Sequence, residues 1–253
     1  MADRERSVPN DAAAWSDFNA VEYWSTNYAS VLPEDAEIIR FASKFMSEAC
    51  GTGSPFRRAV DVGAGTNLYP GLLMLPWAER IVFTEYASPN ISWLSDNLAD
   101  APGPWDWQPF WDLMAERPDY RAVEQPRRRL AAVHEIRKAS IFDLPPRAWD
   151  LGSMFFVADG MTTAEQEFKR AVDAFIGALE PGSPFMMAFM ENSPGYDVSG
   201  IRFPAIQVTQ ASLDALLTEL PVVGTSVLRT DNSIQRLRIG YDAMLLATGF
   251  VVE

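Results

Sequence analysis

Residues 58–85 read RAVDVGAGTNLYPGLLMLPWAERIVFTE, and this stretch decides the fold of the chain. An apolar run at 59–62 meets the glycine turn Gly63-Ala64-Gly65, and a second apolar run at 81–84 ends on Glu85. This strand–turn–helix–strand pattern opens a nucleotide-binding α/β domain. Glycine suits the turn because the backbone must bend sharply and approach a ligand closely. An acid one strand later can accept hydrogen bonds from both hydroxyls of a ribose.

The details of the turn favour an adenosyl ligand without phosphates over a dinucleotide. A dinucleotide fingerprint requires a third glycine where Leu68 stands, and no Lys or Arg follows the turn until Arg80. Asp61 adds a negative charge before the turn, which a sulfonium compound tolerates better than a pyrophosphate does. The alternative is a chance G-x-G between two strands, and Glu85 at the expected distance argues against it.

The composition indicates one globular domain and argues against nucleic-acid and membrane partners. The 253 residues are 48% hydrophobic and 22% charged, which is enough to bury a sizeable core. The net charge of −13 repels nucleic-acid phosphates and anionic lipids, so we expect no nucleic-acid and no membrane partner. No apolar run approaches membrane-spanning length and the N-terminus lacks an apolar signal core, so we expect a cytoplasmic location.

The chain has one cysteine, Cys50, and one histidine, His134. An intrachain disulfide is therefore impossible, and a zinc site built from Cys and His is not expected. His134 falls at the start of a predicted strand, whereas ligands bind beyond the other ends of such strands. We therefore predict no metal site and a structural role for this histidine.

Hydrophobic periodicity predicts strands and helices along most of the chain. We expect seven strands, near 59–62, 81–84, 134–138, 149–157, 185–190, 222–229 and 241–248. Helices are expected near 33–49, 91–98, 125–133, 163–179 and 212–220. This order predicts an α/β fold: a Rossmann-like, mostly parallel sheet with an antiparallel last strand and helices on both faces.

Three segments fall outside these strands and helices. Residues 1–14 are polar and small, and we expect them to be mobile unless a ligand orders them. Residues 101–112 carry three prolines and three tryptophans, which predicts an ordered insertion that covers the sheet edge. Residues 191–204 are rich in turn-forming residues and predict a loop.

Residues 15–28 hold five aromatic side chains at spacings of about three to five. One interpretation is an amphipathic helix that packs on the body of the protein. The other is a flap whose tyrosines close over the ligand. Composition and spacing alone favour the first.

Five motifs extend the pattern over most of the chain. They are Phe18-Asn19-x-x-x-Tyr23-x-x-x-x-Tyr28, Asp61-Val62-Gly63-Ala64-Gly65-x-x-x-Tyr69, Thr84-Glu85-Tyr86-x-x-x-Asn90, Trp105-Asp106-Trp107-x-Pro109 and Ser193-x-x-Tyr196. Together they resemble the motifs of the class I S-adenosylmethionine-dependent methyltransferases of the nicotinamide, phenylethanolamine and thioether (indolethylamine) N-methyltransferase family. The resemblance runs from Phe18 to about Thr248 and implies the class I methyltransferase fold.

The resemblance implies S-adenosyl-L-methionine as the cofactor. It also favours the flap interpretation of residues 15–28 over the packed helix. Tyr23 and Tyr28 match tyrosines that close over the methionine part of the cofactor in the family. The implied cofactor-binding residues are Tyr23, Tyr28, Gly63, Ala64, Gly65, Asn67, Tyr69, Glu85, Tyr86, Asn90, Ser140 and Ile141. Three positions depart from the family pattern: Glu85 replaces an Asp, Asn67 a Thr, and Ser140 an acid on the adenine side.

The acceptor side departs further from the family. Phe189 stands where the family member that methylates nicotinamide has an acid, and Ala205 where it has a serine. Both partners for a carboxamide are absent, so we predict that nicotinamide is not the substrate. Ser193 and Tyr196 match substrate-side residues of the family.

The implied catalytic residues are Tyr23, Asp159 and Glu191. Asp159 matches a family acid close to the cofactor. Glu191 either binds an ammonium or aromatic amine beside aromatic faces, or faces water as an acid at the start of a loop.

We therefore expect one methyltransferase domain, with a helical cap at 1–56 and the Rossmann-like core at 57–253. The expected reaction moves a methyl group from S-adenosylmethionine to a small-molecule acceptor, most simply an amine or an N-heterocycle. Alignment and exclusion of water suffice for a sulfonium donor, so a dedicated base is optional. Cyclisation of the cofactor to a cyclic amino acid and methylthioadenosine, and cofactor binding without catalysis, stay open, as do an S or O acceptor and a monomeric or homodimeric state.

Overall fold

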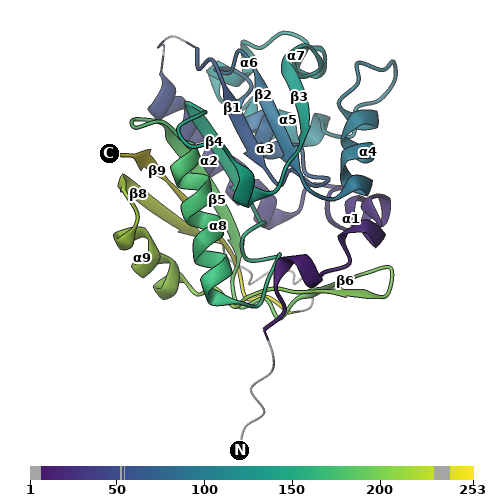
Figure 1. Cartoon of the computed structure of the whole chain (residues 1–253). Coiled ribbons are helices and arrows are strands. Elements are labelled where there is room, and N and C mark those ends of the chain that lie inside the picture. Colours follow the sequence, from purple (N-terminus) through teal and green to yellow (C-terminus); the bar gives the residue numbers. More distant parts are fainter. Residues whose placement is uncertain (1–6, 52, 54, 231–239) are drawn as a thin grey trace, which may run out of the picture.

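A seven-stranded sheet runs through the centre of the protein (Figure 1). The computed structural model describes residues 7–51, 53, 55–230 and 240–253. In chain order, the strands of this sheet are β1 (Ala59–Val62), β2 (Ile81–Glu85), β3 (His134–Lys138), β4 (Leu151–Phe155), β5 (Pro184–Met190), β8 (Val222–Arg229) and β9 (Met244–Val251). Their spatial order is β3-β2-β1-β4-β5-β9-β8.

Strands β1 to β5 pair in parallel, and β9 lies antiparallel between β5 and β8. The predicted mixed sheet with an antiparallel last strand is therefore confirmed. The central strands β1 and β5 are buried at every position, which explains why their sequences are continuous apolar runs rather than alternating ones. The edge strand β3 is only partly buried and reads HEIRK.

Helices cover both faces of the sheet (Figure 1). The α-helices are α1 (Ala20–Asn27), α2 (Pro33–Cys50), α3 (Tyr69–Met74), α4 (Ser88–Asn97), α5 (Gln108–Met114), α6 (Pro118–Arg121), α7 (Pro126–Val133), α8 (Glu165–Ala178) and α9 (Gln210–Glu219). The predicted helix after residue 33 starts on a proline with two acids in its first turn, as expected of a helix N-terminus.

The core has two parts, one on each side of the sheet. Alternate residues of a strand point into different parts of the core. Ile81 and Phe83 of β2 pack with α2, α3 and α4. Val60 of β1 and Phe185 of β5 pack with α8 and α9. This alternation follows from the two-residue repeat of a strand.

The 101–112 insertion is ordered, as predicted, and its helix packs mainly on other helices. Its helix α5 contacts α2 and α3, whereas α4 contacts β3. Trp107 and Phe110 are buried, and the Trp107 ring lies 5.9 Å from that of Tyr28. The insertion therefore thickens the helical layer behind the N-terminal segment.

The structure departs most from the sequence-based expectation at the last strand and in the segment 191–204. The last strand begins at Met244 rather than near residue 241, and residues 231–239 before it lie outside the described residues. The segment 191–204 contains a hairpin of β6 (Tyr196–Val198) and β7 (Ile201–Phe203), where a loop was expected. Ser199 and Gly200 at its tip have φ of 51° and 77°, which suits a two-residue turn between twisted strands.

The aromatic N-terminal segment forms the short helices η1 (Asn10–Ala12) and η2 (Trp15–Asp17), followed by α1. Asn19 caps α1, since its side chain accepts from the Glu22 N–H at 3.1 Å. Glu22 in turn accepts the backbone N–H of Ser199 at 3.0 Å and also its hydroxyl, so this segment is bound to the hairpin tip. The division into a cap at 1–56 and a core at 57–253 stays a prediction.

Candidate functional site

A first cavity opens at the carboxyl ends of the parallel strands, where the sequence predicts the ligand site. Eleven of the twelve predicted cofactor residues line it: Tyr23, Tyr28, Gly63, Ala64, Gly65, Asn67, Glu85, Tyr86, Asn90, Ser140 and Ile141. The twelfth, Tyr69, is fully buried behind the cavity, with its ring stacked on Phe110 at 5.9 Å. Tyr69 therefore supports the cavity wall through its neighbours.

The glycine turn has the backbone that the sequence predicts. Gly63 and Gly65 have φ of 64° and 56°, in the left-handed region that favours glycine. A Cβ on Gly63 would lie 2.7 Å from both methyl groups of Val157. A Cβ on Gly65 would instead project toward Asn90 Nδ2 at 3.9 Å and Glu85 Oε2 at 4.0 Å. The lack of a Cβ thus lets Gly63 pack against Val157, just after β4, and keeps the space beside Gly65 open toward two residues that line the cavity.

Glu85 is held in a fixed orientation by the backbone around it. Its Oε1 accepts the N–H groups of Tyr86 at 2.6 Å and Ala87 at 2.7 Å, and its Oε2 accepts that of Gly65 at 2.8 Å. Burial raises the pKa of this carboxyl, and these hydrogen bonds oppose the rise. A carboxylate fixed in this way can accept hydrogen bonds from a ligand diol without first losing side-chain freedom.

Three buried polar atoms near Glu85 have no hydrogen-bond partner within the part of the chain that the structure describes. They are Thr66 Oγ1, Asn67 Nδ2 and Asn90 Oδ1, all from residues that line the first cavity. A buried polar atom without a partner is costly, so such a group suits a polar ligand. The hydroxyl, amide N–H and carbonyl groups fit the amino, carboxylate and hydroxyl groups of an adenosyl amino acid. Thr66 follows the glycine turn directly, and sequence reasoning missed it.

Aromatic rings of the N-terminal segment lie over the first cavity. The Tyr23 ring is 6.2 Å from that of Tyr28, and the Tyr28 ring is 6.2 Å from that of Tyr69. Phe18 lies 5.1 Å from Tyr23 and also lines the cavity. This placement favours the flap interpretation. Phe18 begins the first of the five sequence motifs, but it was not among the predicted cofactor-binding residues.

A second cavity of about 390 Å³ adjoins the first. The two cavities share four lining residues, Tyr23, Phe156, Gly160 and Tyr196. Phe156 has a φ of 60°, an uncommon conformation for a bulky residue and one that costs free energy. The backbone is thus strained at the junction of the two cavities. Strained residues of this kind cluster at functional sites.

Asp159 lines the second cavity and is almost fully buried. Its Oδ2 accepts the Met190 N–H at 2.8 Å, while its Oδ1 has no partner among the described residues. Burial raises the pKa of this carboxyl to about 7, because the charged form loses its hydration. Asp159 can therefore exchange a proton near neutral pH.

Glu191 is engaged elsewhere. Its Oε2 pairs with Arg229 of β8, at 2.6 Å from Nη2 and 2.8 Å from Nε, and its Oε1 accepts the Gln210 N–H at 3.4 Å. Glu191 is not among the residues that line either cavity, in contrast to Asp159. Ser193 and Tyr196, the predicted substrate-side residues, do line the second cavity, so the structure brings them together with Asp159.

His134 and Cys50 are not among the residues that line either cavity. His134 Nδ1 lies 2.9 Å from the Ala131 carbonyl at the end of α7. Burial raises the pKa of the Cys50 thiol to about 12, which keeps the thiol protonated at neutral pH. The described ranges contain no group of three potential metal ligands. They also contain no helix that is long and apolar enough to span a membrane.

Comparison with known proteins places the chain in a family. The model of the NNMT/PNMT/TEMT family matches residues 7–244. No curated protein sequence matches the chain significantly.

Three solved structures illustrate the fold. The chain is similar to the N-methyltransferase NodS from Bradyrhizobium japonicum WM9 in complex with S-adenosyl-L-homocysteine, with 12% identity over 87% of this chain and 89% of that one, and a TM-score of 0.51. It is similar to 1,6-didemethyltoxoflavin-N1-methyltransferase from Burkholderia thailandensis, solved with 1,6-didemethyltoxoflavin and S-adenosylhomocysteine (16% identity, 87% and 80% covered, TM-score 0.51). It is also similar to the [4+2]-cyclase SpnF (12% identity, 92% and 92% covered, TM-score 0.54). At these identities the likeness shows the fold alone.

Proposed function

The chain belongs to the NNMT/PNMT/TEMT family, and we propose that it is an S-adenosylmethionine-dependent methyltransferase that methylates a nitrogen of a small molecule. The observation that carries the proposal is the pair of adjoining cavities. One has an adenosyl-type cradle around Glu85, the other has a buried carboxyl oxygen on Asp159, and Tyr23 and Tyr196 belong to both.

The residues of the first cavity would hold the cofactor. Glu85 accepts the ribose hydroxyls, and the turn at Gly63 and Gly65 lets the backbone pass beneath the ligand. Thr66, Asn67 and Asn90 supply the buried polar atoms that the amino acid part of the cofactor satisfies. S-adenosylmethionine supplies a methyl group on a sulfonium, which needs no further activation. The remaining requirement is alignment with the acceptor in a site without water.

Asp159 and the shared aromatic residues would prepare the acceptor. A protonated amine must lose a proton before its nitrogen lone pair can attack, and Asp159 with a pKa of about 7 can take that proton. The rings of Tyr23 and Tyr196 lie 5.9 Å apart at the junction and offer faces to a cationic or aromatic acceptor. Ser193 adds a hydroxyl in the same cavity. Glu191 is left out of the proposed machinery because Arg229 already pairs with it.

Nicotinamide remains excluded in this proposal. Phe189 packs on Phe168 with ring centroids 5.9 Å apart and is not among the residues that line the second cavity. Ala205 does line that cavity, but its methyl group offers no hydrogen bond to a carboxamide. An amine or a different N-heterocycle suits the site better.

The test is incubation of the protein with methyl-labelled S-adenosylmethionine and a panel of amines, pyridines and thioethers, followed by mass spectrometry of the products. We expect label on a nitrogen acceptor, S-adenosylhomocysteine as the co-product, and no label on nicotinamide. Label on a sulfur or oxygen acceptor alone would refute the nitrogen assignment.

The same experiment separates the two alternatives. Cyclisation of the cofactor predicts methylthioadenosine with no acceptor present, whereas a non-catalytic protein binds the cofactor and yields neither product. The second cavity, at about 390 Å³, leaves room for a second small molecule and so favours transfer over cyclisation. The fold itself does not distinguish methyl transfer from another reaction, because SpnF, a [4+2]-cyclase, has a similar fold.

A further inference from the structure

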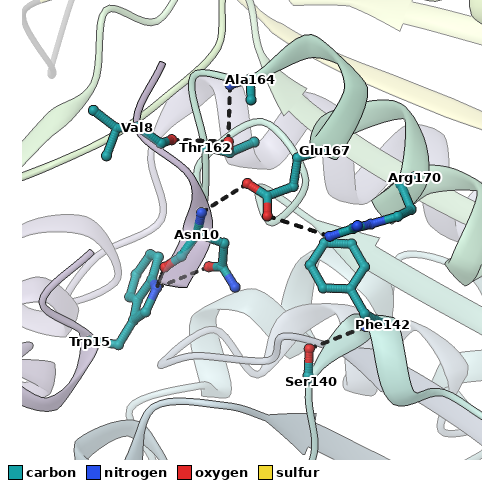
Figure 2. A network of polar contacts seen from close by, with 9 residues as sticks. All are labelled: Val8, Asn10, Trp15, Ser140, Phe142, Thr162, Ala164, Glu167 and Arg170. Carbon is teal, nitrogen blue, oxygen red and sulfur yellow. Dashed lines mark hydrogen bonds and ion pairs between the residues drawn. The ribbon is translucent and has the colours of Figure 1, made fainter. Parts of the chain in front are cut away.

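Residues 8–15, called the strap below, cross the rim of the first cavity and are fastened to the start of α8 (Figure 2). The Val8 N–H donates to Thr163 Oγ1 at 2.7 Å. The Val8 carbonyl accepts from Thr162 Oγ1 at 3.1 Å and from the Thr163 N–H at 3.0 Å. These residues are about 155 positions apart in the sequence, so only the folded chain brings them together.

Asn10 is fixed within the strap by both its backbone and its side chain. Its backbone N–H donates to Glu167 Oε2 at 2.8 Å, and Glu167 also pairs with Arg170 at 3.6 Å. Its side-chain Oδ1 and its backbone carbonyl both accept from Trp15 Nε1, each at 2.9 Å. The indole N–H is only a donor, so chemistry requires the amide oxygen to face Trp15. The amide nitrogen must then point the other way, and Figure 2 shows it on the side away from Trp15, toward Ser140.

Asn10 lines the first cavity, as do Ser140, Ile141 and Met161. Glu85 is the one carboxylate among the lining residues that the structure describes. Ser140 Oγ accepts the Phe142 N–H at 3.3 Å, and the Arg170 guanidinium lies 4.0 Å from the centre of the Phe142 ring. Both Asn10 and Ser140 are thus held by residues anchored to α8 (Figure 2).

We propose that Asn10 recognises the adenine base of the cofactor, with its Nδ2 donating to N1 on the edge that carries the 6-amino group. That edge is the part of adenine farthest from the ribose, which the proposed function assigns to Glu85; the inference rests on that function. An amide NH₂ group is a donor, and N1 of adenine is an acceptor, so the two are complementary. Hypoxanthine carries a hydrogen on N1 and a 6-oxo group, so it presents the opposite pattern to Asn10.

The test compares two ligands, S-adenosylhomocysteine and S-inosylhomocysteine, by isothermal titration calorimetry on the full chain. We expect the wild-type protein to bind the adenosyl ligand about tenfold more tightly, the ratio that one hydrogen bond supports. In Asn10→Asp an oxygen still accepts from Trp15, but an acceptor replaces the Nδ2 donor. The preference should therefore fall to about one or reverse. Asn19→Asp is the matched control, since Asn19 caps α1 outside the first cavity, and it should leave the ratio unchanged.

A purely structural role of the strap has a different signature. If Asn10→Asp only loosened the strap, both ligands would weaken equally and the ratio would stay near its wild-type value; that result would overturn the inference. Trp15→Phe provides a second test, because it removes the donor that orients the amide, and the ratio should again fall toward one. A wild-type protein that binds neither ligand would instead refute the proposed function. A wild-type protein that binds both ligands equally would refute the role of Asn10 alone.

Discussion

Glu85→Gln should weaken cofactor binding while leaving the protein folded. The glutamine keeps the size and one oxygen of the glutamate but loses the charge. Its carbonyl can still accept the Tyr86 and Ala87 N–H groups, while its NH₂ group faces the Gly65 N–H, which loses its acceptor.

The size of both effects follows from these contacts. A hydrogen bond to a charged group contributes about 1.5–3 kcal/mol, so losing the charged acceptor for the ribose diol should raise the dissociation constant about 10–100-fold. The unpaired Gly65 N–H should cost about 1–3 kcal/mol of unfolding free energy. A domain with an ordinary stability of 5–15 kcal/mol survives that loss.

Calorimetric titration with S-adenosylhomocysteine and a denaturant-unfolding curve measure the two effects separately. Glu79→Gln is the control, because Glu79 is an exposed acid that precedes β2 at its other end, and it should change neither quantity. A folded Glu85→Gln protein with wild-type affinity would refute the assignment of this carboxylate to the cofactor.

Three further predictions concern the acids and glycines of the site. Asp159→Asn should lower the turnover of an ammonium acceptor about 10²–10⁴-fold without changing the affinity for the cofactor. It should also remove the limb of the pH–rate profile near pH 7, and a retained limb would contradict proton transfer to Asp159. Burial also raises the pKa of Asp61 to about 8, so the folded state binds protons that the unfolded state has released, and stability should decline as pH rises from about 4 to 8. Denaturant midpoints at pH 5.5 and 8.5 should differ less in Asp61→Asn than in the wild type. Gly63→Ala should destabilise the fold more than Gly65→Ala, since only the first places a Cβ 2.7 Å from Val157; equal thermal shifts would contradict this.

The sheet was predictable because its signals are local. The apolar runs, the glycine turn and Glu85 lie within thirty residues, and the backbone geometry of Gly63 and Gly65 follows from the lack of a Cβ. The start of the last strand was missed because it depends on residues beyond the local pattern: β9 pairs with β5 from Met244 onward and with β8 from Leu245 onward.

The roles of the two candidate acids could not be separated from the sequence. Asp159 and Glu191 both follow strands at the same edge of the sheet, and both belong to a predicted site. Arg229, 38 residues after Glu191, pairs with Glu191, whereas Asp159 keeps an oxygen without a partner among the described residues. Which acid meets a counter-charge depends on how β8 lies beside β9, and no local spacing encodes that.

By itself, the sequence predicted the kind of ligand and the edge of the sheet where the ligand would bind, because glycine conformations, strand periodicity and the sign of a charge are properties of single residues and short segments. Tertiary structure decided which side chains reach that edge. Asn10 and Trp15 lie more than 120 residues before Ser140 in the chain, yet the bonds from the strap to Thr163 and Glu167 place them at the same cavity. Such long-range placement comes from packing and hydrogen bonds between distant elements, which only the folded chain can form.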